Sequence, residues 1–106
     1  MMERRQEPRV ACVLEAIWDG QSGTQPCRVT DLSWHGCFVQ SWYAPAVANE
    51  AVVTVTLGGD RVDLRGRVRY VEARMGFGLM FDTISFHQAT AMGLVLCEPA
   101  VAREIA

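Results

Sequence analysis

Residues 61–70 read RVDLRGRVRY. In this stretch, charged residues alternate with four apolar ones: Val62, Leu64, Val68 and Tyr70. Because successive side chains of a β-strand point to opposite faces, this period of two predicts a strand with one buried face. Gly66 interrupts the buried face and predicts a bend or bulge there. The arginine face is either a solvated outer surface or a stripe that meets a partner or flanks a ligand.

Similar patterns on both sides of this stretch predict further strands, separated by turns rich in glycine. The expected strands cover residues 10–18, 27–32, 36–42, 52–57 and 76–81. The first strand should bury alternate residues, namely Val10, Cys12, Leu14, Ala16 and Trp18. The last should bury Phe77, Leu79 and Phe81. The glycines in Gly58-Gly59-Asp60 fit a hairpin turn, and the following Arg61-Val62 does not continue a cyclase GGDEF motif.

A helix is expected after the last strand. Ser85 and Gln88 have the spacing of a capping box, and Pro99 ends the segment after about Cys97. The helix residues expected to face the rest of the protein are Phe86, Ala89, Met92, Gly93 and Leu96. The chain is therefore predicted to have six antiparallel strands followed by one helix.

Composition restricts the function. The 106 residues suit one domain, and a net charge of −2 argues against bulk attraction to nucleic acid or anionic membrane. No secretory signal or membrane-length apolar run is visible, so a cytoplasmic protein without membrane insertion is expected. Four cysteines without close pairing, and His35 and His87 far from zinc-finger spacing, predict reduced core thiols and no metal site. No cofactor is expected, and no catalytic constellation indicates an enzyme.

Two short motifs lie at one end of the predicted sheet. Arg5 and Arg9 form an RxxxR string that follows Arg4 directly, and Asp31, Ser33 and Gly36 form a DxSxxG string after the second strand. Together they resemble the cyclic di-GMP signature of PilZ domains. The sequences GRVRY at 66–70 and GFGLMF at 76–81 are similar to that family's GxVxW and GxGxxF strands.

This resemblance implies an all-β fold with a terminal helix, namely a six-stranded antiparallel β-barrel plus a C-terminal α-helix. Residues 1–106 would form one domain. Residues 1–9 would be a flexible ligand-binding segment, 10–82 the barrel and 85–98 the helix.

The resemblance also implies roles for single residues. Arg5 and Arg9 would bind the guanine Hoogsteen edge and the phosphates, which suits a planar guanidinium. Asp31 would accept hydrogen bonds from guanine N1 and N2, and Ser33 would bond nearby. Gly36 would allow close backbone approach. Arg4 occupies a position that the family associates with two intercalated copies of the ligand. Flanking contacts are expected from Trp34 and Tyr70.

Structural alternatives stay open for each of these residues. The arginines could be a solvated terminal run, Asp31 and Ser33 could only close a turn, and Gly36 could only provide a positive φ. Trp34 could instead meet a protein partner, and Tyr70 could belong to the core.

The expected function is a receptor or adaptor that binds cyclic di-GMP, orders its N-terminal segment and relays the signal to an unknown downstream protein. One competing interpretation is a PilZ-like interaction module in pilus assembly or motility that binds no nucleotide. Another is a barrel that binds single-stranded nucleic acid through Arg65, Arg67 and Arg69, but the acidic net charge disfavours it.

Overall fold

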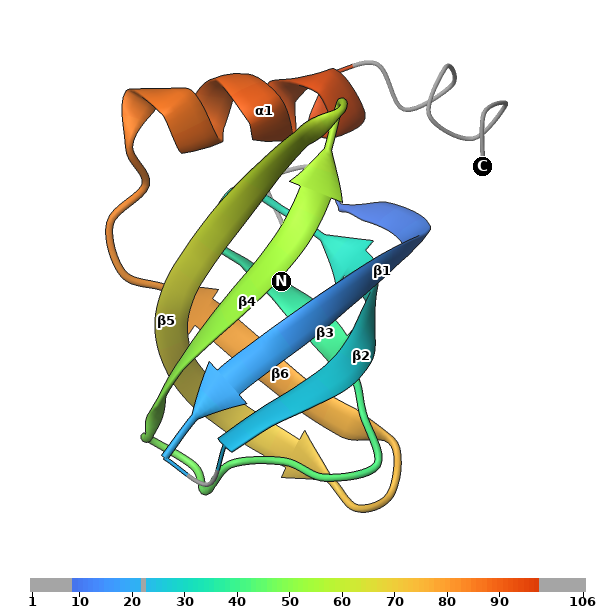
Figure 1. Ribbon diagram of the computed structural model, residues 1–106, viewed down its shortest axis with the longest axis vertical. Coiled ribbons are helices and arrows are strands. Elements are labelled where there is room, and N and C mark those ends of the chain that lie inside the picture. The colour runs from blue at the N-terminus through green and yellow to red at the C-terminus, as the bar shows by residue number, and fades with distance from the viewer. Residues whose placement is uncertain (1–8, 22, 98–106) are drawn as a thin grey trace, which may run out of the picture.

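The structure is a computed structural model that describes residues 9–21 and 23–97 (Figure 1). It contains six strands and then a helix, in the predicted order. They are β1 (Val10–Gly20), β2 (Gly23–Leu32), β3 (Gly36–Gln40), β4 (Glu50–Leu57), β5 (Asp60–Glu72), β6 (Gly76–Phe81) and α1 (Phe86–Leu96). None of the described helices is long and apolar enough to cross a membrane.

The strands form one closed antiparallel barrel in the order β1-β2-β3-β6-β5-β4. Pairing of β1 with β4, for example Ala16 with Val55, closes it. Closure leaves no unpaired sheet edge among these strands. The predicted fold class, a six-stranded antiparallel barrel followed by a C-terminal helix, is confirmed.

The barrel is filled by the alternate residues that the sequence marked as apolar. Trp18 and Phe77 are fully buried and meet edge to face, with ring centroids 5.5 Å apart. The Trp18 indole Nε1 donates a hydrogen bond of 2.9 Å to the hydroxyl of Ser41, which is itself buried. A buried indole N–H needs such a partner, so Ser41 fixes the start of the β3–β4 loop against the core.

Strand β5 departs from the predicted pattern near its end. Val62, Leu64 and Val68 are buried as expected, and pairing with β4 continues unbroken past Gly66. Of the predicted bend or bulge at Gly66, the bulge is wrong, because the register with β6 shifts between Val68 and Tyr70 instead. Gly66 is needed for space, since a Cβ there would lie 2.1 Å from the Met80 carbonyl oxygen. The shift turns Tyr70 outward, where it is 45% exposed, so its predicted inward position is also wrong.

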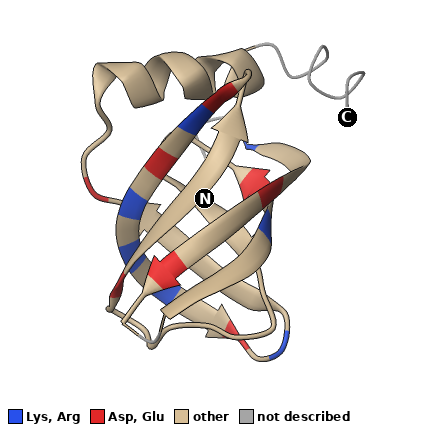
Figure 2. Cartoon of the chain, in the orientation of Figure 1, with Lys and Arg blue, Asp and Glu red and all other residues tan. Residues whose placement is uncertain are grey.

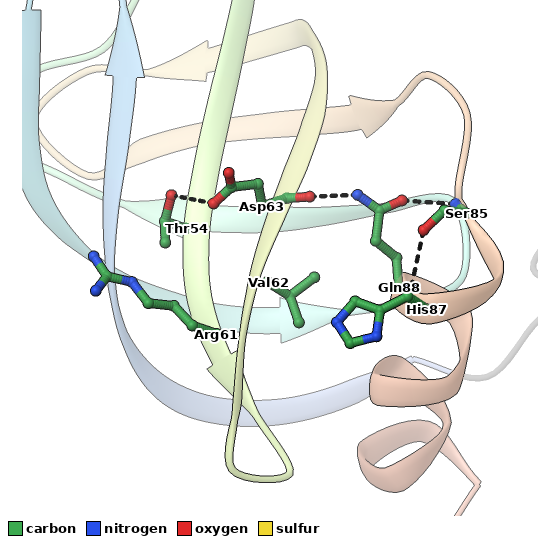
Figure 3. Close-up of a pocket in the computed structure, with 7 residues that line it drawn as sticks. All are labelled: Thr54, Arg61, Val62, Asp63, Ser85, His87 and Gln88. Carbon is green, nitrogen blue, oxygen red and sulfur yellow. Dashed lines mark hydrogen bonds between the residues drawn. The ribbon is translucent and has the colours of Figure 1, made fainter.

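Helix α1 lies across the end of the barrel formed by the tops of β4 and β5 (Figure 1). The capping box is confirmed: Ser85 accepts from the Gln88 backbone N–H, and the Gln88 side chain accepts from the Ser85 N–H. The Gln88 amide also donates to the Asp63 carbonyl of β5 (Figure 3). The buried face of the helix consists of Ala91, Met92, Val95 and Leu96.

The inward position predicted for Phe86 is wrong, because this side chain is 89% exposed. It is the first residue of the helix and lies on the same side as the exposed Thr90, opposite the face of Met92 and Val95 that packs on the barrel. The charged residues of β5 are exposed, and Figure 2 shows how blue and red positions follow one another along this strand.

Candidate ligand-binding site

The candidate site starts from an irregularity in β2. Cys27 and Val29 face the core, so strict alternation would also point Asp31 inward. The register between β2 and β3 shifts between Val29 and Asp31, and that between β1 and β2 shifts between Ala11 and Leu14. The next buried residue is therefore Leu32, and the Asp31 side chain reaches the outer surface. Bulges often re-aim side chains at functional sites, and here the bulge exposes a carboxylate.

Arg9 and Asp31 meet on this outer surface. Arg9 precedes β1, and its Nη2 donates to the Asp31 Oδ2 at 2.7 Å. Their side chains are 39% and 32% exposed. The structure thus brings together one residue from each predicted motif. An ion pair this exposed contributes little to stability, about 0.2–1 kcal/mol, so an incoming ligand can separate the two groups at low cost.

The rest of the DxSxxG motif forms the turn between β2 and β3. The Ser33 N–H donates to the Gly36 carbonyl at 2.9 Å, and the Ser33 hydroxyl donates to the same oxygen at 3.2 Å. The Ser33 side chain is buried, yet its hydroxyl oxygen still has capacity to accept. A turn-closing role for Ser33 is therefore present in the structure, whether or not it also meets a ligand.

The packing of the barrel explains why residue 36 is a glycine. It is not one of the glycines with positive φ, so that alternative is wrong. A Cβ at Gly36 would instead lie 2.4 Å from the Leu79 carbonyl oxygen of β6. The backbone that approaches this glycine closely belongs to the neighbouring strand.

Tyr70 lies in an aromatic pair beside Asp31. Its ring stacks on Phe38 with centroids 6.3 Å apart and an angle of 26° between the planes. Phe38 is the β3 partner of Asp31, and both Phe38 and Tyr70 pair with Gly78 of β6. A Cβ at Gly78 would be 2.4 Å from the Tyr70 ring, so the ring can pack over this strand only because residue 78 has no side chain.

Phe38 was not among the predicted site residues. The signal that could have found it is its position in β3 between the inward residues Cys37 and Val39. Such a position places a large aromatic side chain on the outer face, one strand away from Asp31. The row of cross-strand partners then runs from Asp31 through Phe38 and Gly78 to Tyr70.

Trp34 packs differently from Tyr70. It is partly buried against the core, and its indole Cη2 lies 3.8 Å from where a Cβ on Gly93 of α1 would be. The described contacts of Trp34 are therefore with the core and the helix. Arg4 and Arg5, which complete the predicted site, lie outside the described residues.

The cysteines near the site are unreactive in character. Burial raises the pKa of the Cys12 thiol to about 11, and the Asp31 carboxylate adds to this shift. Burial, and then the neighbouring Cys27, Cys12 and Asp31, raises the pKa of Cys37 strongly. These groups remain neutral thiols at pH 7 and so are poor nucleophiles and metal ligands. In the part of the chain that the structure describes, no cluster of three or more metal-binding side chains occurs.

The site therefore offers a guanidinium, a carboxylate and a stacked aromatic pair on one outer surface. A guanidinium can bind phosphate oxygens or the O6/N7 edge of guanine. A carboxylate is the natural acceptor for the guanine N1–H and N2–H₂ groups. Aromatic rings offer a face for base stacking. These features suit an anionic nucleotide that carries guanine.

Comparison with known proteins adds independent information. Residues 3–95 match the model of the PilZ domain. No curated protein matches the chain. Several solved structures share its fold at low sequence identity. The Bacillus subtilis inhibitor of motility MotI/DgrA has a TM-score of 0.76 and 14% identity, with 94% of this chain and 52% of that one covered.

The second structure is the Borreliella burgdorferi PlzA protein in complex with c-di-GMP, with a TM-score of 0.70 and 16% identity over 89% of this chain and 41% of that one. The third is the PilZ domain of CeSA from a cellulose-synthesizing bacterium, with a TM-score of 0.68 and 15% identity over 87% and 97% of the two chains. This chain thus spans about half of MotI/DgrA and less than half of PlzA. Because the family model covers the barrel and nearly all of α1, the chain belongs to the PilZ domain family.

Proposed function

We propose that this protein is a cyclic di-GMP receptor that binds the dinucleotide with Arg4, Arg5, Arg9, Asp31, Ser33 and Gly36. The observation that carries the proposal is the 2.7 Å contact between Arg9 and Asp31. It joins the RxxxR and DxSxxG motifs on an accessible surface. Family membership and the c-di-GMP complex of the structurally similar PlzA support the choice of ligand.

Ligand binding replaces the internal ion pair. The Arg9 guanidinium turns to a guanine edge or a phosphate, and Asp31 accepts from the guanine N1 and N2 donors. The exposed face of the Phe38–Tyr70 pair supplies a flanking surface beside Asp31. Arg4 favours two intercalated copies of the ligand per chain.

The role is binding and relay rather than catalysis. Ligand contacts with Arg4, Arg5 and Arg9 would hold the N-terminal segment on the barrel and create a new surface for a downstream protein. A receptor of this kind would act in the bacterial cytoplasm, and the unbridged cysteines of the described residues agree with a reducing compartment.

Isothermal titration with cyclic di-GMP tests the proposal. We expect saturable binding that Arg9→Ala and Asp31→Ala each weaken by about 1–3 kcal/mol, because each loses a charged contact. Arg5→Ala should do the same, and Arg4→Ala should change the stoichiometry from two to one. Arg61→Ala is the matched control, since Arg61 is an exposed arginine of β5, and it should leave binding unchanged.

Absence of heat with the wild-type protein, or equal binding by the Asp31 variant, would contradict the receptor proposal. That result would favour a PilZ domain that acts through protein contacts alone. Hydrogen exchange of the N-terminal segment in saturating ligand tests the ordering step separately, and unchanged exchange would remove that step from the mechanism.

A further inference from the structure

A second surface lies at the end of the barrel away from α1 (Figure 1). The β3–β4 loop and the β5–β6 turn present four large apolar side chains there, Trp42, Tyr43, Val47 and Met75, which we call the distal patch. Their exposures are 66%, 61%, 56% and 59%. Scattered apolar side chains are normal on a surface, but Trp42 and Met75 line one groove, and Trp, Tyr and Met are enriched in protein interfaces.

The backbone under the distal patch is held in place before any partner arrives. The Ser41 N–H donates to the Met75 carbonyl at 3.1 Å, which ties the loop to the turn. The Ser41 hydroxyl accepts from the buried Trp18 indole, and Pro45 is buried. Farther along, the Ala48 N–H donates to Val68 at 2.8 Å. A rigid presentation lowers the entropy lost on binding.

The same end of the barrel holds unusual backbone. Among the described residues, Ala48 with φ 76° and Arg74 with φ 66° are the non-glycine residues with positive φ. Residues in the left-handed region carry strain unless they are glycine, and such strain collects at binding and functional sites. One of these residues belongs to the β3–β4 loop and the other to the β5–β6 turn, next to Val47 and Met75 respectively.

The charged residues of a groove beside the distal patch favour a partner with negative charge. It is lined by Trp42 and Met75 and by polar residues that include Glu15, Arg28, Gln40 and Arg74. Glu15 is the one carboxylate among the described lining residues, and it pairs with Arg28 at 3.0 Å. Both partners are more than half exposed, so this pair is weak and open to exchange. Arg74 leaves the groove with an excess positive charge.

We propose that the distal patch docks a segment of another protein in which a large apolar side chain is flanked by carboxylates. The apolar side chain would pack against Trp42 and Met75, and the carboxylates would bind Arg28 and Arg74. Trp, Tyr and Arg are the residue types that most often dominate binding energy at interfaces. The patch thus has both the anchors and the charge for such a partner.

The distal patch begins where β3 ends and β6 starts, and the candidate ligand site lies farther along these two strands. Asp31 and Tyr70 are aligned with the Phe38–Gly78 pair, whereas Gln40 pairs with Gly76 next to Met75. The rise of a strand puts these two pairs about 7 Å apart. The groove and the patch consist of residues other than Asp31, Phe38 and Tyr70, so the docking proposal does not rest on the proposed receptor function.

The test uses the full chain, labelled with ¹⁵N, without any nucleotide. One capped hexapeptide carries a central Leu-Phe pair between two glutamates on each side, and a second carries lysines in place of the glutamates. We expect the acidic peptide to shift the Trp42 indole resonance and the backbone signals of Arg28, Arg74 and Met75. The lysine peptide should bind about tenfold more weakly.

Two variants and one control sharpen the result. Trp42→Ala and Arg74→Glu should each weaken the acidic peptide about tenfold or more, while Phe86→Ala should not, although Phe86 is even more exposed. Equal binding of the two peptides, or shifts away from the patch, would overturn the proposal. So would a dimer in sedimentation that Trp42→Ala dissociates, because it would assign the patch to a second copy of this chain.

Discussion

At the residue scale, the Arg9–Asp31 pair should matter for ligand binding and hardly at all for the stability of the fold. Both side chains are partly exposed, so the pair contributes little to the free energy of unfolding. We expect Asp31→Ala to lower that free energy by less than about 1 kcal/mol in urea denaturation. The same variant should weaken cyclic di-GMP binding by about 1–3 kcal/mol. A large loss of stability would show instead that Asp31 is a structural residue of the β2 bulge.

Gly36 should matter for stability, because this motif residue lies in close contact with the backbone of β6. Gly36→Ala places a methyl group 2.4 Å from the Leu79 carbonyl oxygen, in backbone that pairs with β6 and accepts a hydrogen bond from the Ser33 N–H. We expect it to lower the free energy of unfolding by about 1–3 kcal/mol. Ligand binding should be compared only at temperatures where the variant is folded.

Gly93→Ala is the control for Gly36→Ala, because it should raise the free energy of unfolding instead of lowering it. Gly93 lies in α1, and its nearest neighbour, Trp34, is at an ordinary contact distance of 3.8 Å. Replacing a helical glycine by alanine should stabilise the fold by about 0.5–1 kcal/mol. Stabilisation by Gly36→Ala, measured by the same denaturation, would contradict the close approach of β3 and β6.

Elements differ in how well the sequence predicted them. The strands and the helix start follow from local rules, namely the alternation of residues 61–68 and the capping box at Ser85 and Gln88. The outward turn of Tyr70 could not be predicted, because it depends on a register shift against β6. The helix face was also predicted wrongly, since Phe86 lies on the side opposite Met92 and Val95, which pack on the barrel.

The candidate site, like the fold, could be predicted only in part from the sequence. Asp31, Ser33 and Gly36 could be found from motif spacing. Their surroundings could not, because Phe38 and Tyr70 meet only through the β3-β6-β5 order of the closed barrel. Alternation in β2 even predicts the wrong face for Asp31, and the bulge corrects it. Long-range pairing thus decides the geometry that local patterns leave open.

The link between α1 and the barrel gives a prediction for an element. Ser85 and Gln88 cap each other, and Gln88 also bonds the Asp63 carbonyl of β5. We expect Ser85→Ala to cost about 1 kcal/mol and Gln88→Ala to cost more, because it removes the bond to β5 as well. Urea denaturation with Thr90→Ala as the control checks this, since Thr90 bonds only the helix carbonyl of Phe86. A larger cost for Ser85→Ala would contradict the role of the bond to β5.

At the scale of the whole molecule, the closed barrel protects ionisable thiols. Cys27 and Cys37 are buried and Cys12 is partly buried, whereas Cys97 beyond α1 is exposed. Burial raises the pKa of Cys27 to about 11, with a smaller contribution from Glu15, and that of Cys12 to about 11. An unfolded chain lacks this burial, so its thiols lose their protons near the ordinary value of 9.0.

This difference makes stability depend on pH in the alkaline range. Below pH 9 these thiols are protonated in both states and their contribution is fully present. Between pH 9 and about 11 the unfolded state releases protons that the folded state keeps, so the free energy of unfolding falls as the pH rises. Thermal unfolding at pH 8 and pH 10 should show a lower midpoint at pH 10. Cys27→Ala should reduce this fall relative to its own midpoint at pH 8, and an undiminished fall would exclude Cys27 as one of its causes.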